Sequence, residues 1–378
     1  MVAFITDIIR RPQIDWILFF AILPLLGAGL VTMNSFTGEN YFFEKQIGWV
    51  AISIAWFFFL SLFDFRFLRR TDVLVALFLG AMVLLLALLG LGQVTKGAQS
   101  WFNLGAFSFQ PSDPIKVLVI LILAKYFSRR HIEIAHVKHI IVSGMYAFIP
   151  FLLVFLQPDF GSAIIIFFIW FGMVLVSGIS KKHLATVFLL GLVAFGGLWS
   201  FVFQSYQKDR IMTFVSPLAD IQGAGYNAFQ STIAVGSGTV FGKGVGYGTQ
   251  SRLQFLPEYQ TDFIFAAFAE EWGFMGVLIL FGLFVVVIWR VLANAMVGAT
   301  NFEMLFGVGV AVMLITHFIV HIGMNIGVLP VTGTTIPFLS YGGSNLITVF
   351  TALGILMGMR RYRRTAHKDD TSYEFLGA

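Results

Sequence analysis

Residues 225–273 read GYNAFQSTIAVGSGTVFGKGVGYGTQSRLQFLPEYQTDFIFAAFAEEWG, and this stretch determines how the rest of the chain is interpreted. It lies after about seven apolar segments and before about three more, yet its first part is rich in Gly, Ser, Thr and Gln and too polar to span a bilayer. Connections longer than about 12–15 residues in a compact domain are usually functional or disordered, and the aromatic and apolar residues here argue against disorder. We therefore expect the chemistry of the protein in this segment.

The composition indicates a membrane protein. Hydrophobic residues make up 58% and charged residues 11% of the 378 positions, and the mean hydropathy is +0.87. Soluble domains carry about 25% charged residues. The absence of cysteine excludes disulfides and thiolate chemistry. The net charge of +5 is distributed over the loops, so we interpret it as a topological signal and expect no nucleic-acid partner.

Apolar runs near the length needed to cross about 30 Å of hydrocarbon recur along the whole chain. They predict an all-α polytopic membrane protein of about ten transmembrane helices, in a single domain over residues 1–378. The predicted spans are 15–34, 46–63, 72–92, 112–127, 139–156, 160–178, 184–203, 262–289, 302–327 and 338–359.

Lysine and arginine crowd the loops on one side of these spans, which by the positive-inside rule is the cytoplasmic side. Both termini, including the tail 360–378, are then cytoplasmic, and the large loop 204–260 between spans seven and eight is extracytoplasmic. The crowded side holds Arg10, Arg11, Arg66, Arg69, Arg70, Lys125, Arg129, Arg130, Lys138, Lys181, Lys182, Arg290, Arg360, Arg361, Arg363, Arg364 and Lys368.

Charged residues at the outer ends of several spans predict a polar chamber. Asp113 and Lys116 begin the fourth span, Asp159 lies in the turn between spans five and six, Arg210 follows the seventh and Asp262 opens the eighth. Charges in membrane segments usually pair with one another or line a cavity. Carboxylates and cations together suit a substrate that carries phosphates and hydroxyls.

Four segments closely resemble the SEDS proteins, the shape, elongation, division and sporulation family of bacterial cell-wall polymerases. They are GAQSWFNLGAFSFQPSDPIK (97–116), QPDFGSA (157–163), LPEYQTDFIFAAFAEEWG (256–273) and PVTGTTIPFLSYGGSNL (330–346). The order and the amino-acid sequences of these segments most closely resemble those of the elongation branch of the family. One departure is Asp113, where the family more often has Glu.

The resemblance implies a peptidoglycan glycosyltransferase in the bacterial cytoplasmic membrane, with an extracytoplasmic active site. Such enzymes polymerise lipid II, a disaccharide peptide on undecaprenyl pyrophosphate, for cell-wall elongation and rod shape. The implied partners are a class B penicillin-binding protein and other membrane proteins of the elongation complex. An acceptor hydroxyl attacks the anomeric carbon of the donor, which requires a base and charge stabilisation of the pyrophosphate.

Asp262 matches the catalytic carboxylate of the family, and we interpret it as the general base. We expect Lys116 and Arg210 to hold the pyrophosphate. A divalent cation, Mg²⁺ or Mn²⁺, is chemically plausible there, but the sequence names no ligands. Further substrate-binding candidates are Asp113, Asp159, Lys243 and Glu258, and expected structural polar residues are Glu270, Glu271, Ser340 and Ser344.

Each of these residues also has a purely structural interpretation. Asp262 is placed to cap a helix, and Asp113 and Lys116, three residues apart, can neutralise each other. Asp159 follows Pro158 and can be a turn residue. His317 and His321 lie four residues apart on one span, but without a third ligand they do not predict a zinc site.

Two other classes of function compete with the glycosyltransferase. A flippase or transporter of lipid-linked precursors would need polar residues across the whole membrane, whereas here they crowd the outer half. A scaffold that only binds a partner would leave the membrane charges unexplained.

Overall fold

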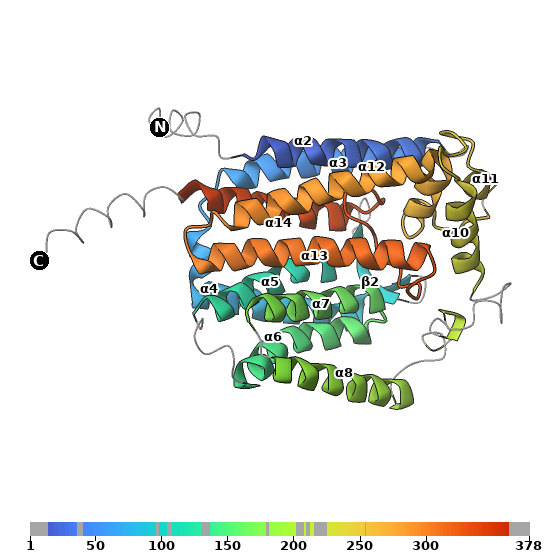
Figure 1. The fold of residues 1–378 in the computed structure, drawn as a ribbon. Helices are drawn as coiled ribbons and strands as arrows, with labels where there is room; N and C mark the ends of the chain where they lie inside the picture. The colour runs from blue at the N-terminus through green and yellow to red at the C-terminus, as the bar shows by residue number, and fades with distance from the viewer. Residues whose placement is uncertain are drawn as a thin grey trace, which may run out of the picture.

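In the computed structural model, the chain forms one bundle of helices that run side by side (Figure 1). It describes residues 14–35, 41–95, 98–103, 108–129, 137–178, 181–201, 208, 212–214, 225–253 and 255–362.

Each of the ten predicted spans contains one helix. Six of these helices, α2, α3, α4, α6, α12 and α13, are both long and apolar enough to cross a membrane. The molecule is therefore a mostly helical, multi-pass membrane protein, and the count of ten spans remains a prediction. The helices are α2 (Trp16–Asn34), α3 (Tyr41–Ser61), α4 (Thr71–Leu91), α5 (Ser112–Ser128), α6 (Val137–Leu156), α7 (Phe160–Val176), α8 (Lys181–Phe201), α12 (Ile264–Ala295), α13 (Asn301–Asn325) and α14 (Gly343–Met359).

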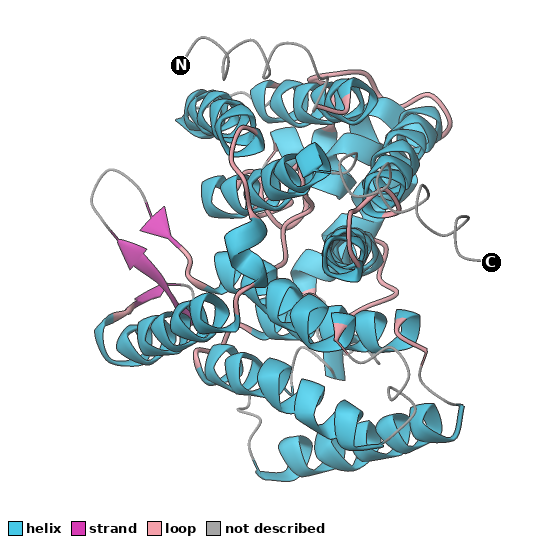
Figure 2. Ribbon diagram, turned by 90° about the vertical axis from the view of Figure 1, so that its left-hand side faces the viewer, coloured by secondary structure: helices cyan, strands magenta, loops and turns pink. Residues whose placement is uncertain are grey.

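The all-α expectation misses a small antiparallel sheet between α4 and α5. Strands β1 (Gln93–Thr95), β2 (Ala98–Asn103) and β3 (Ser108–Phe109) pair in the order β1-β2-β3 and project beside the helices (Figure 2). Gln93 pairs with Trp101 and Phe102 with Phe109. The alternation in these strands is too short to distinguish a hairpin from a loop by sequence.

The large loop is partly helical. It contains α10 (Tyr226–Ser237) and α11 (Thr249–Arg252), which lie at the end of the bundle opposite the start of α2 and the end of α14 (Figure 1). Two short 3-10 helices, η1 (Arg66–Arg69) and η2 (Arg360–Tyr362), lie at that other end.

Helix α13 forms the centre of the bundle and contacts α5, α7 and α12. A capping box starts it, in which Thr300 caps the helix and the carboxylate of Glu303 accepts the Thr300 N–H at 2.9 Å. At the start of α14, a Cβ on Gly343 would lie 2.3 Å from the Trp49 ring of α3. The glycine therefore permits close packing of α14 against α3.

Large apolar side chains cover the outside of the bundle. Val83 on α4 and Ile279 and Val285 on α12 are each about two-thirds exposed, at 65%, 66% and 65%. A soluble protein would bury such residues, whereas in a bilayer they face lipid chains.

Buried acidic side chains pair with partly exposed arginines at the end where α2 begins. Asp15, before α2, accepts from Arg290 of α12 at 2.6 Å, and Glu303 of α13 pairs with Arg69 at 2.5 Å. Other described lysines and arginines lie at this end, among them Arg129 at the C-cap of α5 and Lys138 in the first turn of α6. We call it the basic end of the bundle.

Candidate active site

Asp262 lies at the end of the bundle opposite the basic end, in a tight turn just before α12. The backbone N–H groups of Thr261, Asp262 and Phe263 all donate to the carbonyl of Glu258, at 3.1, 3.1 and 3.2 Å. Glu258 itself has a positive φ of 52°. The N-cap of α12 is Phe263, whose side chain makes no capping hydrogen bond, and Asp262 is half-buried.

Two distant segments hold the backbone of this turn. The hydroxyl of Ser340 donates to the carbonyl of Thr261 at 2.8 Å. The amide of Asn325, at the end of α13, donates to the carbonyl of Asp262 at 3.0 Å and accepts from the N–H of Ala266 at 3.2 Å. The position of Asp262 is therefore fixed through its backbone.

The segment 330–342 packs between the Asp262 turn and the start of α7. At Gly333, where φ is +71°, an added Cβ would lie 3.4 Å from a carboxylate oxygen of Asp262. On the other side, a Cβ on Gly161 would lie 2.6 Å from the methyl group of Thr334 and 2.7 Å from the carbonyl of Thr332. At Gly161 a side chain would force its neighbours to shift, and at Gly333 it would be strained by the positive φ.

The two histidines of α13 hold this segment. The Nδ1 of His317 lies 3.0 Å from the carbonyl of Thr335, and the Nδ1 of His321 lies 2.7 Å from the carbonyl of Thr334. Because a carbonyl only accepts, each Nδ1 carries the proton. The Nε2 atoms of both rings are buried and have no hydrogen-bond partner.

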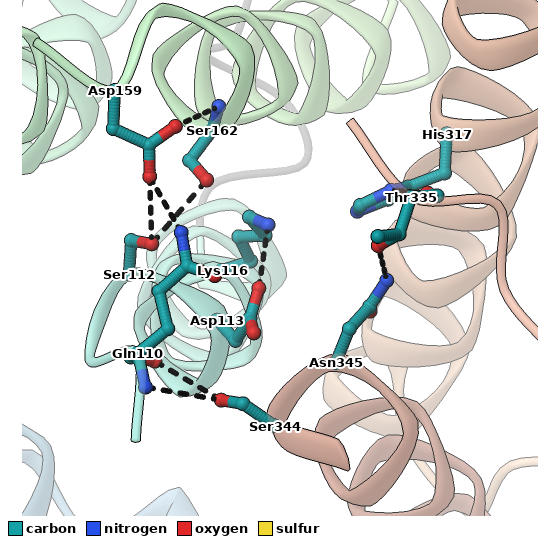
Figure 3. A network of polar contacts seen from close by, with 10 residues as sticks. All are labelled: Gln110, Ser112, Asp113, Lys116, Asp159, Ser162, His317, Thr335, Ser344 and Asn345. Carbon is teal, nitrogen blue, oxygen red and sulfur yellow. Dashed lines mark hydrogen bonds and ion pairs between the residues drawn. The ribbon is translucent and has the colours of Figure 1, made fainter. Parts of the chain in front are cut away.

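Asp159 organises a polar network between α5, α7 and α14 (Figure 3). One carboxylate oxygen caps α7 by accepting the N–H of Ser162 at 3.0 Å. The other accepts from the amide of Gln110 at 2.7 Å and the hydroxyl of Ser112 at 3.2 Å. The hydroxyl of Ser344 donates in turn to the carbonyl of Gln110 at 3.2 Å.

Asp113 and Lys116 form a buried ion pair in the first turns of α5. The Nζ of Lys116 lies 2.9 Å from one carboxylate oxygen of Asp113, and each side chain is 4% exposed. The second oxygen of Asp113 has no hydrogen-bond partner. In Figure 3 the ring of His317 points from α13 toward this pair. The pair is thus incompletely satisfied, as a site that receives a polar ligand would be.

Glu270 and Glu271 attach the loop to α12. Buried Glu270 accepts from the Nζ of Lys243 at 2.7 Å and from the N–H of Thr249 at 2.9 Å. Glu271 accepts from the backbone N–H of Gly246 in the loop at 2.9 Å and also from the hydroxyl of Ser35, the C-cap of α2. The charge of Lys243 is therefore engaged by a protein carboxylate, and a substrate would have to compete for it.

Two glycines let the loop approach α12 at the same place. Gly273 interrupts the helix with φ 66° and ψ −170°, a conformation available essentially only to glycine. A Cβ on Gly273 would lie 2.2 Å from the backbone nitrogen of Gly242.

Two tyrosines lie at the Asp262 turn: Tyr259 is part of it, and the backbone N–H of Tyr341 donates to the carbonyl of Gln260. Burial raises the pKa of the Tyr259 phenol, and burial likewise raises that of Tyr341, so both stay protonated and can donate at neutral pH. The same turn carries the carboxyl groups of Glu258 and Asp262. Within the described part of the chain, no three His, Asp or Glu side chains gather as metal ligands.

Sequence reasoning named most of these residues but not all. Glu258 lies in the Asp262 turn, and its carboxylate accepts from the Thr261 hydroxyl at 3.1 Å. Arg210 lies outside the described residues. Gln110 and Asn325 were not predicted, although a polar side chain inside or beside an apolar span is the signal that would have identified Asn325.

Comparisons with known proteins agree with this architecture. The family model for FtsW, RodA and SpoVE, described as a cell cycle protein, matches residues 13–365. The peptidoglycan glycosyltransferase MrdB of Escherichia coli K12 is 35% identical over 359 residues, covering 95% of this chain and 96% of that protein. Stage V sporulation protein E of Bacillus subtilis is 34% identical, covering 94% and 99%.

Solved structures are similar over the same length. The rod shape determining protein RodA of Thermus thermophilus gives a TM-score of 0.70 at 29% identity, covering 93% of this chain and 97% of that one. A chain from a peptidoglycan synthase complex that coordinates polymerization and crosslinking gives 0.79 at 30% identity, covering 93% and 98%. Because sequence and fold both match over nearly the whole length, this protein belongs to the FtsW/RodA/SpoVE family.

Proposed function

We propose that the protein is a peptidoglycan glycosyltransferase that polymerises lipid II for cell-wall elongation and rod-shape maintenance, with Asp262 as its general base. The observation that carries the assignment of the base is the geometry of its turn. The backbone around Asp262 is held by Ser340 and Asn325, while its carboxylate is half-buried beside Gly333 at the end of the bundle. A base requires such a fixed position and access to substrate.

In the reaction, an acceptor sugar hydroxyl attacks the anomeric carbon of the donor. A new carbon–oxygen bond forms, the bond from the anomeric carbon to the pyrophosphate breaks, and undecaprenyl pyrophosphate leaves with the electron pair. The proton of the hydroxyl passes to the carboxylate of Asp262. Because pyrophosphate is a good leaving group, no second carboxylic acid is needed to protonate it, unlike in glycoside hydrolysis.

Lys116 and Arg210 are proposed to bind the donor pyrophosphate. Lys116 donates one hydrogen bond to Asp113, and its ammonium has further N–H donors for an oxygen of the pyrophosphate. Asp113 and Asp159 then position the ends of α5 and α7, and Lys243 and Glu258 are further candidate contacts.

A divalent cation fits the site only together with the substrate. Mg²⁺ commonly binds one or two carboxylates plus substrate phosphates, so the lack of a three-ligand cluster among the described residues is compatible with it. Asp262 is the carboxylate in position to share such an ion. When bound, the ion would neutralise charge on the pyrophosphate.

The partner we propose is a class B penicillin-binding protein, with other elongation-complex membrane proteins. The similarity to a chain from a peptidoglycan synthase complex that coordinates polymerization and crosslinking supports a crosslinking partner.

The topology we propose places the basic end in the cytoplasm and the α10–α11 end outside. Met296 is 75% exposed in the connection at the basic end, and Tyr247 is 68% exposed at the other. In this cysteine-free chain, Tyr247→Cys should react with an impermeant thiol reagent in intact cells and Met296→Cys should not. The reverse labelling would overturn the topology.

Polymerisation of lipid II by purified protein tests the role of Asp262. Asp262→Asn keeps the size of the side chain and removes the base, so we expect a loss of about 10²–10⁴-fold in rate. Glu258→Gln, a matched change in the same turn, should retain far more activity.

Folding must be measured alongside, by thermal unfolding in detergent. Asn keeps the size of Asp and can still form hydrogen bonds, so a purely structural role of Asp262 in the turn would leave both folding and rate nearly unchanged. A folded Asp262→Asn variant with near wild-type rate would transfer the assignment of the base to Glu258 or Asp159.

A further inference from the structure

A pocket of about 170 Å³ opens on the surface at the basic end of the bundle, where α4, α5 and α6 meet. It lies at the opposite end from Asp262 and shares no residue with the candidate active site. Its walls combine apolar side chains with two cations and two phenols: Thr71, Leu74, Val75, Phe78, Ile122, Lys125, Tyr126, Arg129 and Tyr146.

The two cations of the pocket lack carboxylate partners in the described part of the chain. Lys125 donates to the backbone carbonyl of Arg69, and Arg129 is exposed at the C-cap of α5. The acid at the start of α4, Asp72, is already paired with Arg70 at 2.8 Å. Arg69 and Arg290 at this end pair with the buried acids Glu303 and Asp15, whereas no described acid pairs with the two cations of the pocket.

The apolar wall of the pocket continues along α4 toward the middle of the membrane. Val75, at the pocket, is 50% exposed, and Leu79 and Val83, one and two turns farther, are 59% and 65% exposed. On α6, Tyr146 closes the other side and packs edge-on against Phe78, with ring centroids 6.3 Å apart. An amphiphile with an anionic head and an apolar chain would match both parts of this surface.

We propose that this pocket is a binding site for an anionic glycerophospholipid of the leaflet at the basic end. The phosphate lies between Lys125 and Arg129, and an acyl chain follows the exposed face of α4. Basic pockets between transmembrane helices recognise anionic head groups in this way. A zwitterionic lipid carries its own ammonium group, which would face these two cations and weaken its binding.

Native mass spectrometry of the full-length protein, released from nanodiscs of equal phosphatidylglycerol and phosphatidylcholine, tests the proposal. Wild type should retain phosphatidylglycerol in preference to phosphatidylcholine. Near a membrane surface each Lys or Arg contributes about 1 kcal/mol to anionic lipid binding. The Lys125→Gln, Arg129→Gln double variant should therefore lose about 30-fold in that preference, since tenfold corresponds to about 1.4 kcal/mol.

Two further variants separate the pocket from general surface charge. Lys138→Gln removes an exposed cation at the same end that does not line the pocket, and it should leave the retained lipid unchanged. Val75→Trp fills the exposed mouth of the pocket and should displace the lipid while both cations remain. Thermal unfolding in detergent checks that each variant is folded.

The proposal is overturned if wild type retains the two lipids equally. It also fails if Lys138→Gln lowers retention as much as the double variant, which would indicate a diffuse surface effect. Competition by glycerol 3-phosphate as strong as by the intact lipid would show that the site takes a free phosphate instead.

Discussion

Breaking the buried pair of Asp113 and Lys116 from one side should cost far more than removing both charges. Each side chain is 4% exposed and the two charged atoms lie 2.9 Å apart, so a single replacement leaves a charge buried without its partner. Loss of one member of such a pair costs about 3–5 kcal/mol, whereas replacing both by apolar groups is often neutral or stabilising. We therefore expect Asp113→Leu and Lys116→Met each to destabilise by about 3 kcal/mol or more.

The free energy of unfolding of the double variant should lie within about 1 kcal/mol of the wild-type value. The coupling energy between the two residues in this double-mutant cycle is then several kcal/mol. The free oxygen of Asp113 supports the low net value of the pair, because this carboxylate exchanges water for only one hydrogen bond. Equilibrium unfolding of the four proteins in mixed detergent micelles measures the cycle. As a control, the exposed pair Arg66–Asp64, with side chains 62% and 41% exposed, should show about 0–1 kcal/mol.

The reasoning is refuted if the two single costs simply add in the double variant. The same protein also separates folding from substrate binding. A folded double variant that fails to polymerise lipid II supports a role for the Asp113–Lys116 pair in the reaction, whereas wild-type affinity and rate would end the proposed role of Lys116.

Two further predictions concern folding and the basic end. Burial alone would raise the pKa of Asp15, but hydrogen bonds from Arg290 and Asn294 hold it below its ordinary 3.8. The stabilisation of the fold by the ionised carboxylate is therefore present above about pH 4 and is lost as the pH falls further. Asp15→Asn keeps the helix cap and should cost about 1.5–3 kcal/mol at pH 7, with the difference from wild type shrinking in acid. Gly273→Ala should lower thermal stability by at least about 1–3 kcal/mol because of its backbone conformation. Gly282→Ala, where no atom lies within 4 Å of the added Cβ, should be neutral or stabilising, and equal effects would contradict this account.

Hydropathy predicted the helical ranges closely because each apolar run must satisfy its own backbone in the bilayer. The run predicted at 72–92 is helical over Thr71–Leu91, and the one at 302–327 over Asn301–Asn325. The sheet at 93–109 was missed, since a three-residue strand depends on its partner and has little periodicity of its own.

The sequence predicted the residues of the candidate site that carry a charge at a membrane span. It did not predict the contacts that these residues make with residues distant in the sequence. Asp113, Lys116 and Asp159 are conspicuous as ionisable groups at membrane spans. Their partners are less so: the hydrogen bond from Ser344 to Gln110 joins residues 234 positions apart, and nothing in either local sequence indicates it. Lys243, expected at the substrate, is paired with Glu270 through the same kind of long-range contact.

The hydrogen bonds that hold the Asp262 turn also determine when the entropy of ordering this turn is lost. Ordering a flexible backbone costs about 1–2 kcal/mol per residue. Here Ser340 and Asn325 fix the turn as the chain folds. That entropy is therefore lost a single time, when the protein is made, and an enzyme that adds many sugars to one strand does not lose it again at each addition.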